Sequence, residues 1–110
     1  MSVIKKLLIS LTLFLMASSK SHSVLIDVRT LEEWKSGHLK GAIHIPLNII
    51  SEDINKFVKS YNEEVLLYCR SGNRSGKAKN ILDALGYSNT INLGGITDAS
   101  KLEELEIIKN

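Results

Sequence analysis

The chain has 110 residues, enough for one domain, and carries 14 Lys and Arg against 12 Asp and Glu. The resulting formal charge of +2 gives no reason to expect a nucleic-acid partner. A single cysteine, Cys69, excludes an internal disulfide and leaves three options for that thiol: an inert buried side chain, an intermolecular bridge or a reactive nucleophile.

The first 23 residues have the layout of a secretory signal peptide. Lys5 and Lys6 precede the uncharged apolar run Leu7–Ala17, and small polar residues follow. This run is shorter than the roughly 20 residues that cross a bilayer, although an uncleaved anchor is the alternative. We therefore expect residues 1–23 to be a signal peptide cut near residues 19–23, and residues 24–110 to form one periplasmic or secreted domain without stable membrane insertion. Without Lys5 and Lys6, basic and acidic residues are equal in number.

The remaining chain alternates between strand and helix patterns. Strands are predicted over Val24–Val28, Ala42–Ile45, Val65–Cys69 and Thr90–Leu93, with Pro46 stopping the second and Gly94-Gly95 forming a turn after the fourth. Strands that are apolar on both faces and alternate with helices are typical of a parallel sheet. The sequence therefore predicts an α/β fold, in which a short, mainly parallel sheet has helices on both faces.

Capping residues mark most of the predicted helices. Thr30 and Glu33 form a capping box for a helix over Leu31–Ser36 that ends at Gly37. Further helices are predicted over Ser75–Leu85, with Gly86 just past its end, and over Lys101–Ile108. Another helix is predicted after a Ser51 cap, with an apolar face made of Ile54, Phe57, Val58 and Tyr61.

Cys69 is the last residue of a predicted parallel strand, and ligands of such sheets bind beyond the carboxyl ends of the strands. The loop that follows contains Gly72 and Asn73, which tolerate left-handed backbone, so its N–H groups can turn toward the sulfur. Arg70 and Arg74 add positive charge, and no acid occurs between positions 65 and 82. These features lower the cysteine pKa from about 8.5 and favour a thiolate that attacks a small anionic substrate.

Three sequence blocks resemble the family of single-domain rhodaneses, which are thiosulfate sulfurtransferases. The first is the loop Cys69–Ser75, after Leu66-Leu67-Tyr68; the second is Leu25–Arg29, Glu33-Trp34, Gly37–Leu39 and Gly41–Pro46; the third is Leu85–Tyr87 followed by Gly94-Gly95. Together with the signal peptide, they are most similar to the small periplasmic rhodaneses of the phage-shock type. The resemblance spans residues 24 to about 97 and implies a rhodanese-like three-layer sandwich.

The resemblance also implies a reaction and a site. Cys69 takes a sulfane sulfur from thiosulfate or a similar donor, becomes a persulfide, and passes the sulfur to cyanide or a thiol. The implied substrate-binding residues are those of the loop: Arg70, Ser71, Gly72, Asn73, Arg74 and Ser75. Arg74 has a salt bridge as its alternative role, and Ser75 a helix cap. No metal, cofactor or nucleic acid is implied, and we expect a monomer.

Other polar residues of these blocks are interpreted as scaffold rather than chemistry. Asp27 and Arg29 are expected to form ion pairs or turn hydrogen bonds with Glu33 and its neighbours, and His38 is placed with them. His44 lies next to a strand edge and is expected at the surface as readily as in a structural role.

Two rival functions stay open at this stage. Cysteine phosphatases and arsenate reductases also follow a strand with a cysteine and an arginine, but they have five residues between the two, whereas Cys69 and Arg74 have four. A non-catalytic rhodanese-like binding module is the second rival, although such modules usually lack the cysteine. The chain also departs from the family pattern by lacking the usual first strand and helix, and the tryptophan that often follows Gly94-Gly95.

Overall fold

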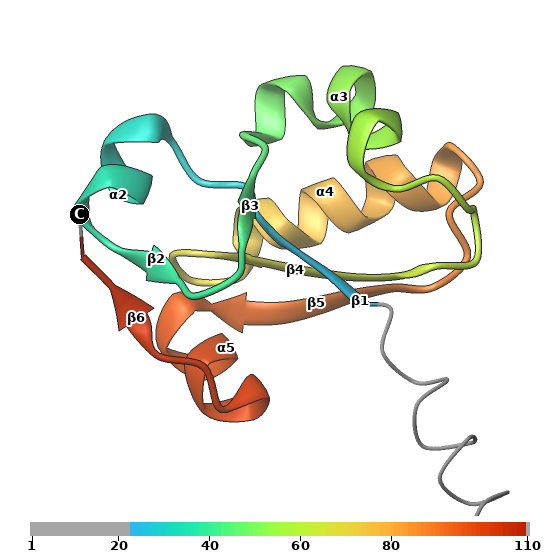
Figure 1. Ribbon diagram of the computed structural model, residues 1–110. Coiled ribbons are helices and arrows are strands. Elements are labelled where there is room, and N and C mark those ends of the chain that lie inside the picture. Colours follow the sequence, from blue (N-terminus) through green and yellow to red (C-terminus); the bar gives the residue numbers. More distant parts are fainter. Residues whose placement is uncertain (1–22, 110) are drawn as a thin grey trace, which may run out of the picture.

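The structure is a computed structural model that describes residues 23–109. Its main sheet has four parallel strands in the order β3-β1-β4-β5 (Figure 1). In chain order the elements are β1 (Ser23–Asp27), α2 (Leu31–Ser36), β2 (His38–Leu39), β3 (Ile43–His44), the 3-10 turn η1 (Leu47–Ile49), α3 (Ile50–Phe57), β4 (Glu64–Cys69), α4 (Asn73–Ala84), β5 (Thr90–Gly95), α5 (Ile96–Glu103) and β6 (Ile107–Ile108). The predicted α/β fold with a mainly parallel sheet is therefore confirmed.

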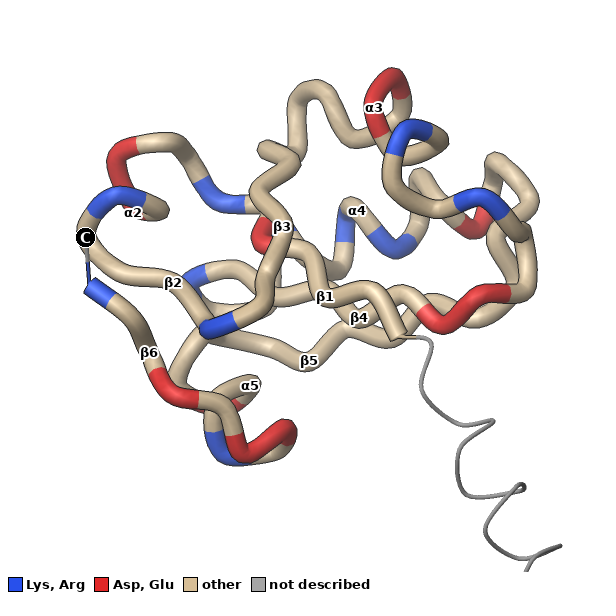
Figure 2. The backbone as a smooth tube through the Cα atoms, in the orientation of Figure 1, with Lys and Arg blue, Asp and Glu red and all other residues tan. Residues whose placement is uncertain are grey.

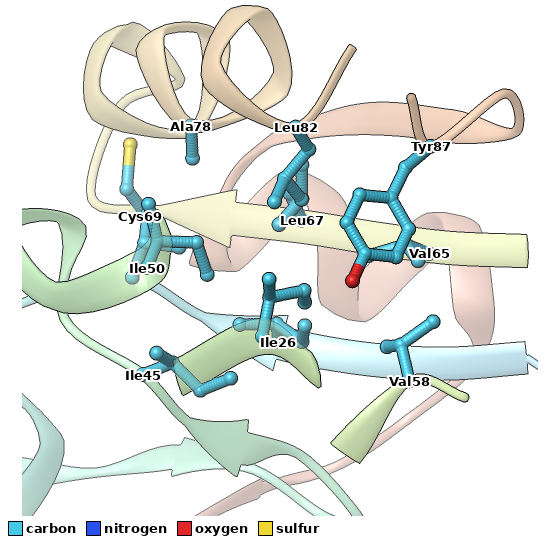
Figure 3. Close-up of a cluster of buried hydrophobic side chains, with 12 residues drawn as sticks. Ile26, Ile45, Ile50, Val58, Val65, Leu67, Cys69, Ala78, Leu82 and Tyr87 are labelled. Atoms are coloured by element: carbon cyan, nitrogen blue, oxygen red, sulfur yellow. The ribbon is translucent and has the colours of Figure 1, made fainter. Parts of the chain in front are cut away.

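Side chains alternate between the two faces of the central strands, so each face has its own core. On one face α3 and α4 cover a cluster that contains Cys69 (Figure 3). The other members of this cluster are Ile26, Val28, Ile45, Ile50, Ile54, Val58, Val65, Leu67, Ala78, Leu82 and Tyr87. On the opposite face α5, through its own Ala99, packs on Leu25, Leu39, Leu66, Tyr68 and Leu93. Helices therefore lie on both faces, and the sulfur lies on the α4 side.

Local capping signals fix two of the helices where the sequence predicts them. Thr30 accepts a hydrogen bond from the Glu33 backbone, and the Glu33 carboxylate accepts one from Thr30 N–H, so α2 begins with the expected capping box. Gly86 follows α4 with a φ of +104°, the left-handed backbone that glycine tolerates. The start of α4 is two residues earlier than predicted, at Asn73, and its end is one residue earlier, at Ala84.

The prediction for α3 is wrong at both ends. The turn η1 leads directly into α3 at Ile50, so Ser51 already lies inside the helix and caps nothing. The helix ends at Phe57, which is exposed together with Tyr61, whereas Ile54 and Val58 are buried. The apolar face is therefore narrower than the sequence pattern indicates.

The predicted end of the chain is also wrong. Gly94 and Gly95 complete β5 instead of forming a turn, and α5 begins at once with Ile96. The segment predicted as a closing helix instead ends in β6, which pairs antiparallel with β2. This second, two-stranded sheet holds the chain end beside α2 (Figure 1).

The predicted signal peptide lies outside the described residues except for Ser23, the first residue of β1. Between residues 23 and 109, no helix is long and apolar enough to cross a membrane.

Candidate active site

Cys69 ends β4, and its side chain is fully buried on the α4 side of the sheet. In Figure 3 its sulfur points away from the strand toward the start of α4. The next three residues form a tight turn, and α4 begins at Asn73. The sulfur therefore faces the backbone N–H groups at the beginning of a 12-residue helix, where the helix dipole is positive.

Hydrogen-bond donors surround the sulfur atom. Gly72 N–H donates to Sγ at 3.0 Å, and Ser75 Oγ lies 3.3 Å from Sγ. Burial by itself would raise the pKa of the thiol. The hydrogen bonds from the Ser75 hydroxyl and from the backbone N–H groups of Ser75, Ser71 and Gly72 outweigh this effect, and the pKa of Cys69 is lowered below its usual range. The site thus favours a thiolate.

Glycines allow the loop to take this shape. Gly72 has a φ of +100°, as the sequence predicts, while Asn73 has ordinary helical backbone, so the expectation of a left-handed Asn73 is wrong. Gly95 packs directly against the loop, since a Cβ at this position would lie 2.5 Å from the Arg70 carbonyl oxygen. The close contact between the end of β5 and the loop fixes where the Gly72 N–H group points.

The two arginines of the loop differ in their surroundings. Arg74 forms a two-pronged ion pair with Glu33 of α2, with nitrogen–oxygen distances of 2.6 and 2.9 Å. This salt bridge was the alternative role for Arg74, and it lowers the pKa of Glu33 to about 2. Arg70 is exposed, and among residues 23–109 its guanidinium has no hydrogen-bond partner. Arg70 is therefore the loop cation that is available to an incoming anion.

Charges are unevenly distributed around this edge of the sheet. Basic positions lie along α4 and its preceding loop, whereas the acids after α5 lie on the opposite side of the sheet (Figure 2). The loop Cys69–Ser75 itself carries two basic side chains and no acidic one.

Most of the polar residues that the sequence assigns to a structural role form structural contacts. Asp27 and Arg29 form a buried ion pair at 2.7 Å, as predicted, but Glu33 pairs with Arg74 and Thr30 instead of joining them. His38 stacks on Trp34 with 3.6 Å between ring centroids.

His44 is not a surface residue, contrary to one of the two expected roles. It is half-buried, its Nε2 donates to the Arg29 carbonyl at 2.8 Å, and its ring stacks on Trp34. These two contacts give His44 the structural role that was the other expectation.

Ser75 has no capping role. It is the third residue of α4, whose cap is Gly72, and its buried hydroxyl faces Cys69. Ser71 is exposed and contributes through its backbone. Within residues 23–109, no group of three or more His, Cys, Asp or Glu side chains is placed to hold a metal ion.

Comparison with known proteins identifies the family of this site. The family described as "Rhodanese-like domain" matches residues 13–101, which is most of the chain. The chain belongs to the rhodanese-like family. The sequence-based prediction of the family, and with it of a sulfurtransferase, is therefore confirmed.

Individual relatives agree with this assignment. The rhodanese-like chain is 44% identical over 73 residues to the thiosulfate sulfurtransferase PspE of Escherichia coli, covering 66% of this chain and 70% of that protein. It is 35% identical over 72 residues to a sulfurtransferase of Allochromatium vinosum, covering 66% and 65% of the two proteins. A solved structure described as a rhodanese with anions from E. coli superimposes with a TM-score of 0.74 at 38% identity, covering 80% of this chain and 99% of that one. For several other relatives, including a putative sulfur carrier protein of Bacillus subtilis, the chain spans less than two thirds of their length.

Two features of this rhodanese-like site are not predicted from the sequence. The first is a cavity of about 520 Å³ beside the loop, lined by Val28, Arg29, Thr30, Leu31, Pro46, Leu47, Asn48 and Arg74. The second is Asn92 of β5, whose side chain bonds to both Gly72 and Ser75. The sequence signal for Asn92 is a polar residue between the apolar residues Ile91 and Leu93 of β5.

Proposed function

We propose that the protein is a thiosulfate sulfurtransferase that works through a persulfide on Cys69. The observation that carries this proposal is the set of donors around Sγ: the Gly72 N–H at 3.0 Å, the Ser75 hydroxyl at 3.3 Å and the backbone N–H groups of Ser71 and Ser75. A nucleophilic sulfur needs such stabilisation as an anion. The similarity to PspE, itself named a thiosulfate sulfurtransferase, supports thiosulfate as the donor.

In the first half-reaction the Cys69 thiolate attacks the outer, sulfane sulfur of thiosulfate. A new sulfur–sulfur bond forms to Sγ, the bond between the two sulfurs of thiosulfate breaks, and sulfite leaves with the electron pair. No proton is transferred, so the step needs no base beyond the loop. The cysteine persulfide carries its negative charge on the terminal sulfur, where the same N–H donors can stabilise it.

In the second half-reaction a nucleophile attacks the terminal sulfur of the persulfide. With cyanide, the sulfur–carbon bond of thiocyanate forms while the sulfur–sulfur bond breaks, and Cys69 returns as a thiolate. A thiol acceptor in its thiolate form reacts in the same way and becomes a persulfide itself. The loop stabilises an anionic sulfur on Cys69 before and after each step.

We assign donor binding to the loop Arg70–Ser75, with Arg70 as the main contact for the sulfonate end of thiosulfate. Arg70 is exposed and has no partner among residues 23–109, whereas Arg74 is held by Glu33. The cavity lined by Arg74 lies beside the loop, and its lining residue Val28 donates a backbone hydrogen bond to the carbonyl of Tyr68, the residue before Cys69.

An assay with purified protein tests the proposed function. Thiosulfate with cyanide should give thiocyanate, and Cys69→Ser should abolish this product while leaving the fold intact by circular dichroism. An Arg70→Gln variant should keep the reaction with a raised KM for thiosulfate. Hydrolysis of p-nitrophenyl phosphate without thiocyanate formation would instead favour the cysteine phosphatase, and the absence of both activities would favour a binding module.

We further propose that residues 1–23 direct export and that residues 24–110 form the mature domain. The order of charged, apolar and small polar residues supports this proposal. Expression of the full chain in a bacterium, followed by fractionation and mass measurement, should give a periplasmic product that begins near residues 20–24. A full-length product retained with the membranes would support an uncleaved anchor.

A further inference from the structure

Asn92 of β5 is held in one orientation by two backbone groups. Its Nδ2 lies 3.0 Å from the Gly72 carbonyl oxygen, which can only accept a hydrogen bond. Its Oδ1 lies 2.9 Å from the Gly94 nitrogen, which can only donate. The amide therefore cannot be turned over without losing both bonds, and its oxygen must face the next group in line, the Ser75 hydroxyl.

The Ser75 hydroxyl has two acceptors for its single proton. Its Oγ lies 2.7 Å from Asn92 Oδ1 and 3.3 Å from Cys69 Sγ. When the proton points to Asn92, a lone pair faces the sulfur, and this arrangement suits a protonated thiol. When the proton points to Sγ, it stabilises a thiolate. The two acceptors therefore compete for one buried donor.

We propose that Asn92 is a positioning residue for the nucleophile, which acts by drawing the Ser75 proton away from Cys69. This role rests on the proposed function of Cys69 as the nucleophile. Asn92 sets how readily the Cys69 sulfur becomes a thiolate at the start of each cycle. Once the persulfide has formed, it takes the place of the thiolate and competes with Asn92 for the Ser75 proton.

The shape of the loop has other support than Asn92. The Gly72 carbonyl also accepts a bond from Gly76 N–H at 3.0 Å, inside α4. Gly95 packs against Arg70 and Ser71, and Gly72 packs against Gly94. An apolar residue at position 92 removes one acceptor of the buried Ser75 hydroxyl and the acceptor of Gly94 N–H, while Cys69 Sγ remains within reach of that hydroxyl. Replacing Asn92 therefore mainly changes the competition for the proton.

Two ion pairs lie near the sulfur, while Arg70 of the loop is exposed and unpaired among residues 23–109. Arg74 from α4 pairs with Glu33 from α2, and Asp27 pairs with Arg29 at the end of β1. A substitution at position 92 leaves these pairs in place, so a change in the titration of Cys69 reports on Ser75 and its neighbours.

Two substitutions of Asn92 give opposite expected results. Asn92→Leu removes the competing acceptor and should lower the measured pKa of Cys69, whereas Asn92→Asp keeps an acceptor, strengthens it by charge and should raise that pKa. We expect shifts of about half a pKa unit or more, which change the thiolate fraction about threefold below the pKa. The rate of alkylation of Cys69 by iodoacetamide, measured against pH, reads this pKa directly.

Ser75→Ala provides the decisive background. Without the hydroxyl, Asn92→Leu should no longer shift the alkylation profile, and Asn92→Asp should shift it less than before. Asn89→Asp is the matched control, because it places the same charge before β5, away from the loop, and should leave the profile unchanged. Opposite shifts that depend on Ser75 would support the role. Shifts of the same sign, shifts that persist in Ser75→Ala, or no shift would overturn it.

The alkylation assay also separates this inference from the proposed function. Iodoacetamide reports on the thiol whether or not thiosulfate is the sulfur donor. A protein that forms no persulfide but shows the expected pair of shifts would overturn the sulfurtransferase mechanism and leave the role of Asn92 standing. A protein that forms the persulfide but lacks these shifts would overturn the role of Asn92 and leave the sulfurtransferase mechanism standing.

Discussion

Gly95 packs the end of β5 against the active-site loop, and Gly95→Ala should show how this contact affects both the stability of the protein and the geometry of the loop. The φ of Gly95 is −77°, so alanine is compatible with its backbone. An added Cβ would, however, lie 2.5 Å from the Arg70 carbonyl oxygen, 3.2 Å from its carbon and 3.3 Å from Ser71 Cα. All three are backbone atoms that cannot rotate away, so the loop or the strand end must shift by at least about 0.5 Å.

Both consequences of this shift can be estimated. Overpacking of this kind costs about 1–3 kcal/mol of the free energy of unfolding. Misplacing reactive groups by 1 Å can cost about 100-fold in rate, so a shift of half that size should lower kcat/KM about tenfold or more. The N–H donors turn away from Sγ, and the measured pKa of Cys69 should therefore rise.

Thiocyanate formation, urea unfolding and the alkylation profile measure these effects in one set of variants. Gly41→Ala is the matched control: it has nothing within 4 Å of the added Cβ, and its φ of +85° strains an alanine. It should lose about 1 kcal/mol of stability with its kcat/KM unchanged. A folded Gly95→Ala protein with the kcat/KM and the Cys69 pKa of the wild type would refute the reasoning that β5 positions the loop.

Three further substitutions test other contacts. Glu33→Gln breaks the pair with Arg74. Above about pH 4.5, the free energy of unfolding in urea should be about 1 kcal/mol higher for the wild type than for this variant. Because the pKa of Glu33 is lower in the folded than in the unfolded protein, this difference should be lost toward pH 2. Tyr68→Phe leaves the buried Leu39 N–H without the acceptor it has at 3.0 Å, which should cost about 1–3 kcal/mol in thermal unfolding without changing kcat. Arg70→Gln should leave urea unfolding unchanged and raise the KM for thiosulfate more at low salt than at high salt, because Arg70 is exposed. If Glu33→Gln were as stable as the wild type both above about pH 4.5 and near pH 2, the pair with Arg74 would not stabilise the fold. Unaltered thermal unfolding of Tyr68→Phe would contradict the role of its bond to Leu39. A KM of Arg70→Gln that does not depend on salt would contradict the proposed contact between Arg70 and thiosulfate.

The parts of the fold that local chemistry decides are the parts that the sequence predicts. The capping box of Thr30 and Glu33, the left-handed Gly72 and Gly86, and the buried runs of β1 and β4 all depend on residues close together in the chain. Cys69 at the end of a buried parallel strand belongs with them, because the strand and the glycine that follows are both visible in the sequence.

Contacts between segments that are distant in the chain cannot be predicted from a local sequence pattern. β6 is a strand because it pairs with β2, near the other end of the described chain, although the sequence pattern predicts a helix over Lys101–Ile108. Asn92 meets Gly72 and Ser75, which precede it by 20 and 17 positions, and only the packing of β5 beside the loop brings them together. Ser51 is a residue type that often caps helices, but α3 already begins at Ile50, directly after η1.

The charge of the loop shows the same division. Arg70 and Arg74 look equivalent in the sequence, and both were expected to bind substrate, with a salt bridge as the second option for Arg74. The structure separates them, since Glu33 reaches Arg74 from α2 while Arg70 stays exposed. Which arginine is free depends on the placement of a helix 41 positions away, not on the loop itself.

A mass measurement on the intact protein tests most directly whether Cys69 carries sulfur. Protein purified in reduced form and mixed with thiosulfate should gain the mass of one sulfur atom, and fragmentation should place it on Cys69. Cyanide should remove the added mass and release thiocyanate in equal amount, and Cys69→Ser should gain nothing. A wild-type mass that thiosulfate leaves unchanged, while iodoacetamide still modifies Cys69, would contradict the account.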